Sequence, residues 1–217
     1  MRHLFKLLLF SFLLSACKQE RPGNDSINSS SKDNQLQKQI QLMPYEDFDS
    51  TMLPFLQKEI EKFYGYKTTI IQSKKLPAFA YYKLRNRYKA DSLLAYQKAL
   101  LSDETRLLVG LTKKDISSVK ASNPDYGVFG LGFCPGKTCV VSTCRLIWSS
   151  KSHDHLNERL LKVVLHEVGH NLGLPHCTKN KSCLMSAAGG TVKQIDRELK
   201  WLCSDCRKLL QASAAKQ

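Results

Sequence analysis

The 217-residue sequence lacks several features that define large classes of protein. Beyond the amino terminus no apolar run approaches roughly 18 residues, so no transmembrane helix is predicted. No segment of about 20–50 residues repeats, which argues against a solenoid or a propeller. Acidic residues are scarce, 19 against 33 basic ones, for a net charge of +14. The basic residues are scattered, in pairs such as Lys74-Lys75, and no nucleic-acid-binding module is visible, so no nucleic-acid partner is expected.

The amino terminus has the pattern of a bacterial lipoprotein signal peptide, predicted at residues 1–16. Two basic residues lie within the first six, the apolar run Leu7–Leu14 is too short to span a bilayer, and small residues precede Cys17. Cys17 is therefore predicted to be lipidated and to anchor the protein to a membrane of the bacterial cell envelope, facing the periplasm or the exterior. The alternative is an ordinary secretory peptide with an incidental cysteine.

The remaining chain divides by composition. Residues 17–40 contain almost no apolar side chains after Cys17 and are predicted to be a disordered tether, because such a segment cannot offset its chain entropy by burial. Residues 41–217 have the length of a single domain.

Hydrophobic periodicity predicts a domain of the α/β or α+β class. The predicted helices are Phe48–Tyr64, Ala90–Leu101, Leu156–Leu172 and Glu198–Leu210. The predicted strands are Thr68–Ile71, Arg106–Leu111, Tyr126–Phe133 and Cys139–Leu146. Strands that alternate with helices, followed by a helical end, indicate a mixed sheet in an upper half and a smaller, loop-rich lower half.

The segment from His166 to His176 reads H-E-x-x-H-x-x-G-x-x-H. His166 and His170 share one helix face, Gly173 can take the positive φ that ends the helix, and His176 then returns as a third ligand. A fourth position stays open for water, as in catalytic zinc sites. Zinc lowers the pKa of such a water toward about 7, and Glu167, beside the first ligand, is the candidate general base and acid.

The residues that follow specify the family. Cys177 comes directly after the third histidine, then Cys183-Leu184-Met185, then Cys203-x-x-Cys206. This order resembles the archaemetzincins, a branch of the metzincin metallopeptidases that carries a second, four-cysteine zinc site. The resemblance is tight over His166–Cys206 and extends more loosely back to about Gln41. One departure is that five residues separate Cys177 from Cys183, where the family pattern usually has four.

The resemblance implies a metzincin-like fold with the zinc at the floor of a cleft between the two halves. Met185 would be the structural turn methionine beneath the imidazoles. The position two residues later, a tyrosine in some metzincins, is Ala187, so any additional oxyanion donor must come from elsewhere. The stretch Val128–Phe133 is the candidate edge strand that binds an extended peptide; alternatively, it is an internal strand whose small residues serve packing.

The cysteines allow two interpretations. Cys177, Cys183, Cys203 and Cys206 are suited to a closed tetrahedral zinc, but outside the cytoplasm they could instead form two disulfides. Cys134 and Cys139 flank a turn that a disulfide could close, which would leave Cys144 as a free, buried thiol. The two other pairings of these three cysteines are equally permitted.

The sequence therefore predicts a monomeric, lipid-anchored zinc peptidase that acts on peptides or proteins. It would hold one catalytic zinc ion and a second, structural one, and it leaves open whether the enzyme is an endopeptidase or an aminopeptidase. Two other classes stay possible: a non-catalytic, zinc-stabilised binding module, and a zinc amidohydrolase acting on a small or cell-wall amide.

Overall fold

The computed structural model describes residues 39–214. The predicted signal peptide, Cys17 and nearly all of the predicted tether lie outside this range. Within it, none of the helices combines the length and the apolar character needed to cross a membrane.

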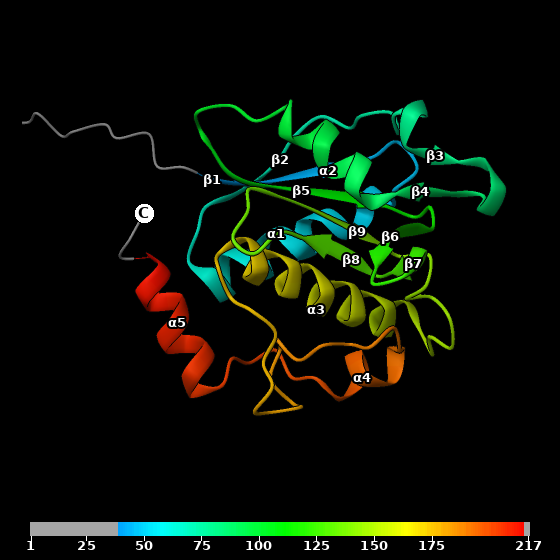
Figure 1. Cartoon of the computed structure of the whole chain (residues 1–217). Helices are drawn as coiled ribbons and strands as arrows, with labels where there is room; N and C mark the ends of the chain where they lie inside the picture. The colour runs from blue at the N-terminus through cyan, green and yellow to red at the C-terminus, as the bar shows by residue number, and fades with distance from the viewer. Residues whose placement is uncertain (1–38, 215–217) are drawn as a thin grey trace, which may run out of the picture. The chain divides into compact units, whose positions relative to one another are not determined.

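A five-stranded mixed sheet is the framework of the domain (Figure 1). Its order is β2 (Thr68–Ile70), β1 (Gln39–Pro44), β5 (Thr105–Thr112), β9 (Thr138–Ser142) and β8 (Gly130–Gly132). The first four strands are parallel, and β8 runs antiparallel to β9. Among the described residues β8 pairs with no other strand, so the predicted edge position of the stretch Val128–Phe133 is confirmed for its central part.

Side chains alternate along the central strands and build two apolar layers. On β5, Leu107 and Val109 contribute to one core and Leu108 to the other. Helices α1 (Leu53–Tyr64) and α3 (His153–Asn171) cover the first face, and α2 (Ala90–Lys98) covers the second (Figure 1). Because these strands are buried on both faces, they read in the sequence as continuous apolar runs.

A second, four-stranded sheet lies beside the first. Its order is β3 (Tyr81–Tyr82), β4 (Arg87–Lys89), β6 (Ile116–Lys120) and β7 (Asn123–Val128). The single strand predicted at Tyr126–Phe133 is therefore two strands in two sheets, β7 and β8. The break falls at Phe129, whose side chain is buried and whose carbonyl accepts a hydrogen bond from Ser142 at the end of β9.

The predicted helices near Tyr64, Lys98 and Leu172 are confirmed, with different ends. A short 3-10 turn, Ser50–Met52, capped by Asp49, precedes α1, so this helix starts later than predicted. Ser152 caps α3 by accepting a hydrogen bond from the His155 backbone, so that helix starts earlier. Two further 3-10 turns, Ala78–Ala80 and Lys83–Arg85, lie between β2 and β4.

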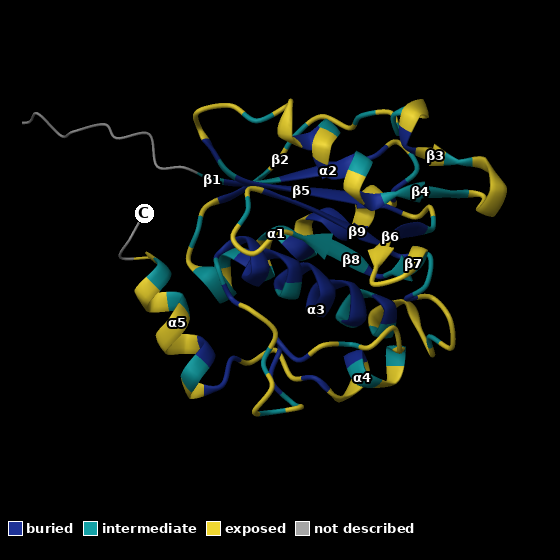
Figure 2. Cartoon of the chain, viewed as in Figure 1, coloured by how far each residue is buried: buried dark blue, intermediate teal, exposed yellow. Residues whose placement is uncertain are grey.

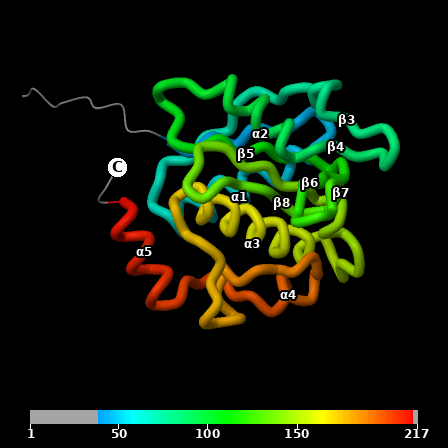
Figure 3. The backbone as a smooth tube through the Cα atoms, viewed as in Figure 1, coloured from blue at the N-terminus to red at the C-terminus, as the bar shows by residue number. Residues whose placement is uncertain are grey.

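The lower half follows α3. The chain leaves this helix, passes below it to α4 (Val192–Arg197) and returns to α5 (Ser204–Ala214) (Figure 3). The helix predicted over Glu198–Leu210 is confirmed only from Ser204 onward, and residues 198–203 are not helical. The amide of Leu199 donates a hydrogen bond to the carbonyl of Ser182, and the carbonyl of Trp201 accepts one from the amide of Leu184. These bonds tie residues 198–203 to the loop before Met185, so this segment does not form a helix.

Candidate metal centre

Three imidazoles converge at the end of α3. His166 and His170 lie one turn apart on this helix, and Gly173, at φ +96°, ends it and returns the chain so that His176 faces them. One ring nitrogen from each histidine lies within 4.8 Å of the others, and His170 Nε2 is 3.2 Å from His176 Nε2. A tetrahedral zinc with Zn–N bonds of about 2.0–2.1 Å requires N–N separations of about 3.3–3.4 Å. The three histidines therefore fit one zinc ion.

Backbone carbonyls orient two of the rings. His166 Nδ1 donates to the Leu184 carbonyl and His170 Nδ1 to the Leu174 carbonyl, each at 2.7 Å. These bonds leave each Nε2 as the free acceptor nitrogen, the form that binds a metal. Burial lowers the pKa of His166 to about 3, and burial also lowers the pKa values of His170 and His176. All three rings are therefore neutral at pH 7, as zinc ligands must be.

Glu167 is buried beside this centre, with its side chain against β8. A Cβ atom at Gly130 would lie 2.7 Å from Glu167 Cγ, and one at Gly132 would lie 3.1 Å from the Glu167 carbonyl oxygen. Glycine on β8 is therefore needed for the edge strand to approach α3 so closely, which gives the small residues of this strand a packing role as well. Burial raises the pKa of the Glu167 carboxyl to about 8, although a hydrogen bond from the Gly132 backbone lowers it.

Met185 packs against α3 between the two helical histidines. Its side chain is completely buried, and a Cβ atom at Gly169 would lie only 2.6 Å from Met185 Sδ. Its carbonyl accepts a hydrogen bond of 2.7 Å from the amide of Cys177. Met185 is thus packed against α3 at Gly169, the residue before the second helical histidine.

The four carboxyl-terminal cysteines form a second cluster. Their Sγ atoms all lie within 4.8 Å of one another, with 3.7 Å between Cys177 and Cys203 and 3.8 Å between Cys183 and Cys206. A disulfide needs about 2.05 Å, whereas a tetrahedral Zn–S₄ site with bonds of about 2.3 Å has edges of about 3.8 Å. Hydrogen bonds, chiefly from the Cys206 backbone, lower the pKa of the Cys203 thiol to about 7, which favours the thiolate that binds zinc. Of the two interpretations, the geometry fits the zinc site.

Of the three pairings that the sequence permits among Cys134, Cys139 and Cys144, none is present, because all three are free cysteines. The Cys139 side chain points into the core beneath β8, where burial raises the pKa of its thiol, whereas Cys134 is exposed on the turn. Cys144 is a free thiol as predicted, although it is only partly buried.

A cleft of about 310 Å³ contains the three histidines and Glu167. Its lining also includes residues that the motif did not indicate, such as Lys120, Tyr126, Gly190, Ile195 and Glu198. Tyr126 reaches across from β7 to the lower half, since its hydroxyl lies only 2.5 Å from the position that a Cβ atom of Gly190 would take. These residues come from separate segments of the chain that contain no recognisable motif. Only the fold brings them close to the metal centre.

The fold and the metal centre together define a zinc-dependent metallopeptidase. The model of peptidase family M54 matches residues 55–212, so the chain belongs to that family. It is 34% identical to the archaemetzincin of Methanocaldococcus jannaschii over 178 residues, which cover 79% of this chain and 92% of that protein. The family predicted from the sequence is confirmed.

Two solved structures are also similar to this chain. The crystal structure of archaemetzincin from Methanopyrus kandleri matches with a TM-score of 0.71 and 27% identity, covering 84% of this chain and 98% of that chain. The structure of archaemetzincin from Archaeoglobus fulgidus, complexed with malonate, matches with a TM-score of 0.66 and 25% identity, covering 78% and 98%. The predicted metzincin-like fold class is confirmed, and peptides are the substrates of this enzyme class.

Proposed function

We propose that His166, His170 and His176 hold one catalytic zinc ion and that Glu167 is the general base and acid of peptide-bond hydrolysis. The observation that carries this proposal is the convergence of three neutral imidazoles beside a buried carboxyl at the floor of a cleft. When bound, zinc supplies a Lewis acid that polarises the peptide carbonyl and lowers the pKa of a water molecule toward about 7.

The protein's own groups supply the rest of the reaction. Glu167 takes the proton of the attacking water and returns it to the leaving amine. Its low exposure, 7%, keeps this proton transfer away from bulk solvent. The free edge of β8, directly beside Glu167, can pair with an extended substrate through backbone hydrogen bonds and hold the scissile bond over the centre.

The variant Glu167→Gln tests this assignment. Removing the base should lower kcat by about 10²–10⁴-fold, while the zinc content stays the same, because glutamine conserves the shape of the side chain. Glu158→Gln is the matched control, since Glu158 lies on the same helix and does not line the cleft. Unchanged cleavage in Glu167→Gln would contradict the assignment.

The substrate panel should contain internally quenched peptides, peptides with a free amino terminus, and small or cell-wall amides. Cleavage of the quenched peptides identifies an endopeptidase, and a requirement for the free amine identifies an aminopeptidase. Turnover of the amides alone would favour the amidohydrolase, and no turnover at all would favour the non-catalytic, zinc-stabilised module.

We further propose that Cys177, Cys183, Cys203 and Cys206 hold a second, structural zinc. The four cysteine side chains can each supply a thiolate, and their Sγ–Sγ distances match those of a tetrahedral site. Both observations support this proposal. Because Cys177 directly follows His176, such a site would fix the third catalytic ligand in place.

We also propose that the enzyme is a monomer anchored by lipid at Cys17 in the bacterial cell envelope, facing the periplasm or the exterior. The signal pattern of residues 1–16 supports the anchor, and the origin of the whole centre from one chain supports the monomer. Radiolabelled palmitate should enter the wild-type protein and not Cys17→Ala, and light scattering on the purified enzyme should give the mass of one chain. Label in the variant would contradict lipidation.

A further inference from the structure

Val163, Ile195 and Glu198 line the same cleft as the metal centre, and this part of the lining is called the pocket below. Val163 precedes His166 by three residues, about 4.5 Å along the helix axis. Ile195 belongs to α4, and Glu198 follows the end of that helix. A peptide held over the zinc ligands would therefore place the side chain next to its scissile bond in this pocket.

Glu198 carries a buried carboxyl with few polar partners. Its exposed fraction is 3%, and the only hydrogen bond to its carboxyl among the described residues comes from the neutral amide Gln194 Nε2, at 3.3 Å from Glu198 Oε1. No ion pair involves Glu198 in the described part of the chain. Burial raises the pKa of this carboxyl to about 7, although the nearby charge of Lys162 lowers it.

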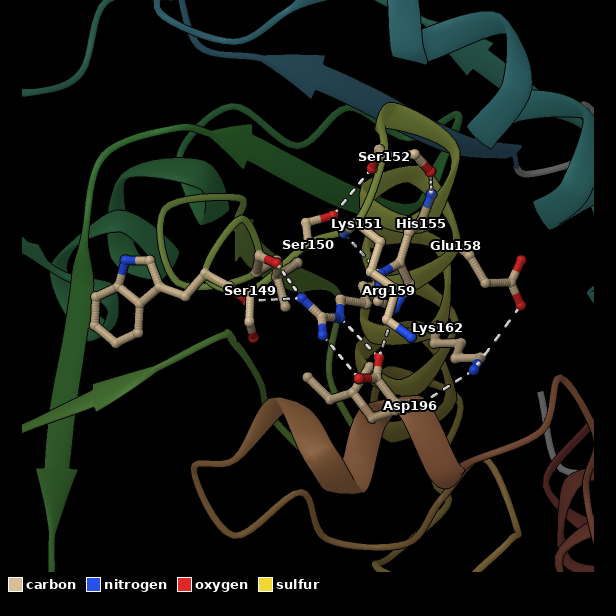
Figure 4. Close-up of polar contacts among 12 residues, drawn as sticks. Ser149, Ser150, Lys151, Ser152, His155, Glu158, Arg159, Lys162 and Asp196 are labelled. Carbon is tan, nitrogen blue, oxygen red and sulfur yellow. Dashed lines mark hydrogen bonds and ion pairs between the residues drawn. The ribbon is translucent and has the colours of Figure 1, made fainter.

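Lys162, whose charge acts on the Glu198 carboxyl, has other partners. Lys162 Nζ donates to the Ile195 carbonyl at 3.2 Å and lies 3.9 Å from Glu158 Oε1. Glu158 in turn lies 3.0 Å from Lys200. Lys162 and Arg159 thus have their partners between α3 and α4 and on Glu158 (Figure 4), while the carboxyl of Glu198 lines the cleft.

The wall that carries Glu198 is held rigidly. Arg159, 2% exposed, binds both carboxylate oxygens of Asp196 at 2.7 Å and also donates to the carbonyls of Leu146 and Trp148 (Figure 4). This clamp joins α4 to α3 and to the loop after β9. The backbone that carries Glu198, two residues after Asp196, is therefore held in place, and such preorganisation reduces the cost of binding.

We propose that Glu198 is a specificity-determining residue, which binds the cationic side chain of a lysine or arginine next to the scissile bond of the peptide substrate. The proposal rests on the proposed catalytic centre. A buried carboxylate without a counter-ion is unfavourable, and a cation that enters the pocket supplies the missing partner. The apolar groups of Val163 and Ile195 are placed to contact the methylene stem of such a side chain.

Paired substrates test the proposal. Two quenched peptides should differ at one position beside the cleaved bond, lysine in one and norleucine, an uncharged residue of similar shape, in the other. With the full wild-type enzyme we expect kcat/KM to be at least tenfold higher for the lysine peptide. In Glu198→Gln this ratio should fall to about one, because a neutral amide does not discriminate between the two side chains. The control variant Glu104→Gln, which removes an exposed carboxyl that does not line the cleft, should keep the wild-type ratio.

A binding measurement separates this proposal from the proposed function. The affinities of both peptides for the Glu167→Gln variant are measured by fluorescence anisotropy, so no turnover is needed. We expect the lysine peptide to bind at least tenfold more tightly, and to lose this advantage when Glu198→Gln is added. Equal affinities, or a preference that persists without Glu198, would overturn the proposal. Absent turnover together with a Glu198-dependent preference would count against the proposed function alone.

Discussion

Replacing Cys206 with serine should remove the structural zinc and loosen the lower half of the domain. The Sγ–Sγ distances of 3.7 and 3.8 Å match the edges of a Zn–S₄ tetrahedron with bonds of about 2.3 Å. A serine hydroxyl is a poor substitute for a thiolate at this position, because at neutral pH it stays protonated. The variant should therefore contain one zinc ion per chain, where the wild-type protein contains two.

The size of the effect follows from the energetics of such sites. Structural zinc contributes an apparent 10–16 kcal/mol or so in small zinc-binding peptides. If one ligand of four accounts for about a quarter of this, losing that ligand alone costs on the order of 3 kcal/mol, and losing the ion with it costs more. A domain of this length loses about 2–4 °C of Tm for each kcal/mol, so Tm should fall by at least roughly 6–12 °C.

Elemental analysis, zinc X-ray absorption and thermal melting measure the three consequences. The wild-type spectrum should contain sulfur scattering near 2.3 Å, and the Cys206→Ser spectrum should lose it. Cys144→Ser is the matched control, because Cys144 is a free cysteine outside the cluster. One zinc per chain in the wild type, together with no thiol that reacts at these four positions after denaturation, would mean two disulfides and would refute the reasoning.

Three further predictions follow from single positions. In Gly130→Ala the new Cβ lies 2.7 Å from Glu167 Cγ, so the carboxyl must shift, and kcat should fall at least tenfold at unchanged zinc content; normal kcat would show that this contact does not hold the base. In Gly169→Ala the new Cβ lies 2.6 Å from Met185 Sδ, and denaturant unfolding should reveal a loss of about 1–3 kcal/mol. In Glu198→Gln the effect on stability should depend on pH. The pKa of the wild-type carboxyl is raised in the folded state from 4.5 to about 7, so wild-type stability is lost as pH rises through this window. The glutamine variant should therefore gain Tm relative to wild type at pH 8 and not at pH 4, and an equal difference at both values would contradict the raised pKa.

The metal centre was predictable because its chemistry is encoded locally. His166, Glu167 and His170 lie on one helix, and their spacing alone fixes their common face. Gly173 and His176 complete the set within a single turn of chain. The four cysteines could likewise be grouped from their order as a zinc site with disulfides as the alternative, and the Sγ distances fit zinc.

The sequence did not predict features that depend on contacts between residues far apart in the chain. Residues 198–203 have helical periodicity, yet their backbone hydrogen bonds to Ser182 and Leu184 prevent them from forming a helix. Glu198 reaches the cleft only because α4 is held by the pair of Arg159 and Asp196, which are 37 residues apart. No local pattern in a sequence reports such a pairing, and the short strands β1 and β6 were overlooked for the same reason.

Both walls of the cleft are joined to the same helix. β8 packs against α3 at Glu167, and the lower half is bonded to it through the Leu184 carbonyl and the Arg159 guanidinium. Neither wall can swing without breaking these contacts, so the mouth of the cleft keeps a nearly constant width. The conformation of the substrate must then fit the cleft, because the cleft does not widen. A stretch of chain that is already unfolded can enter it, and a compact loop cannot.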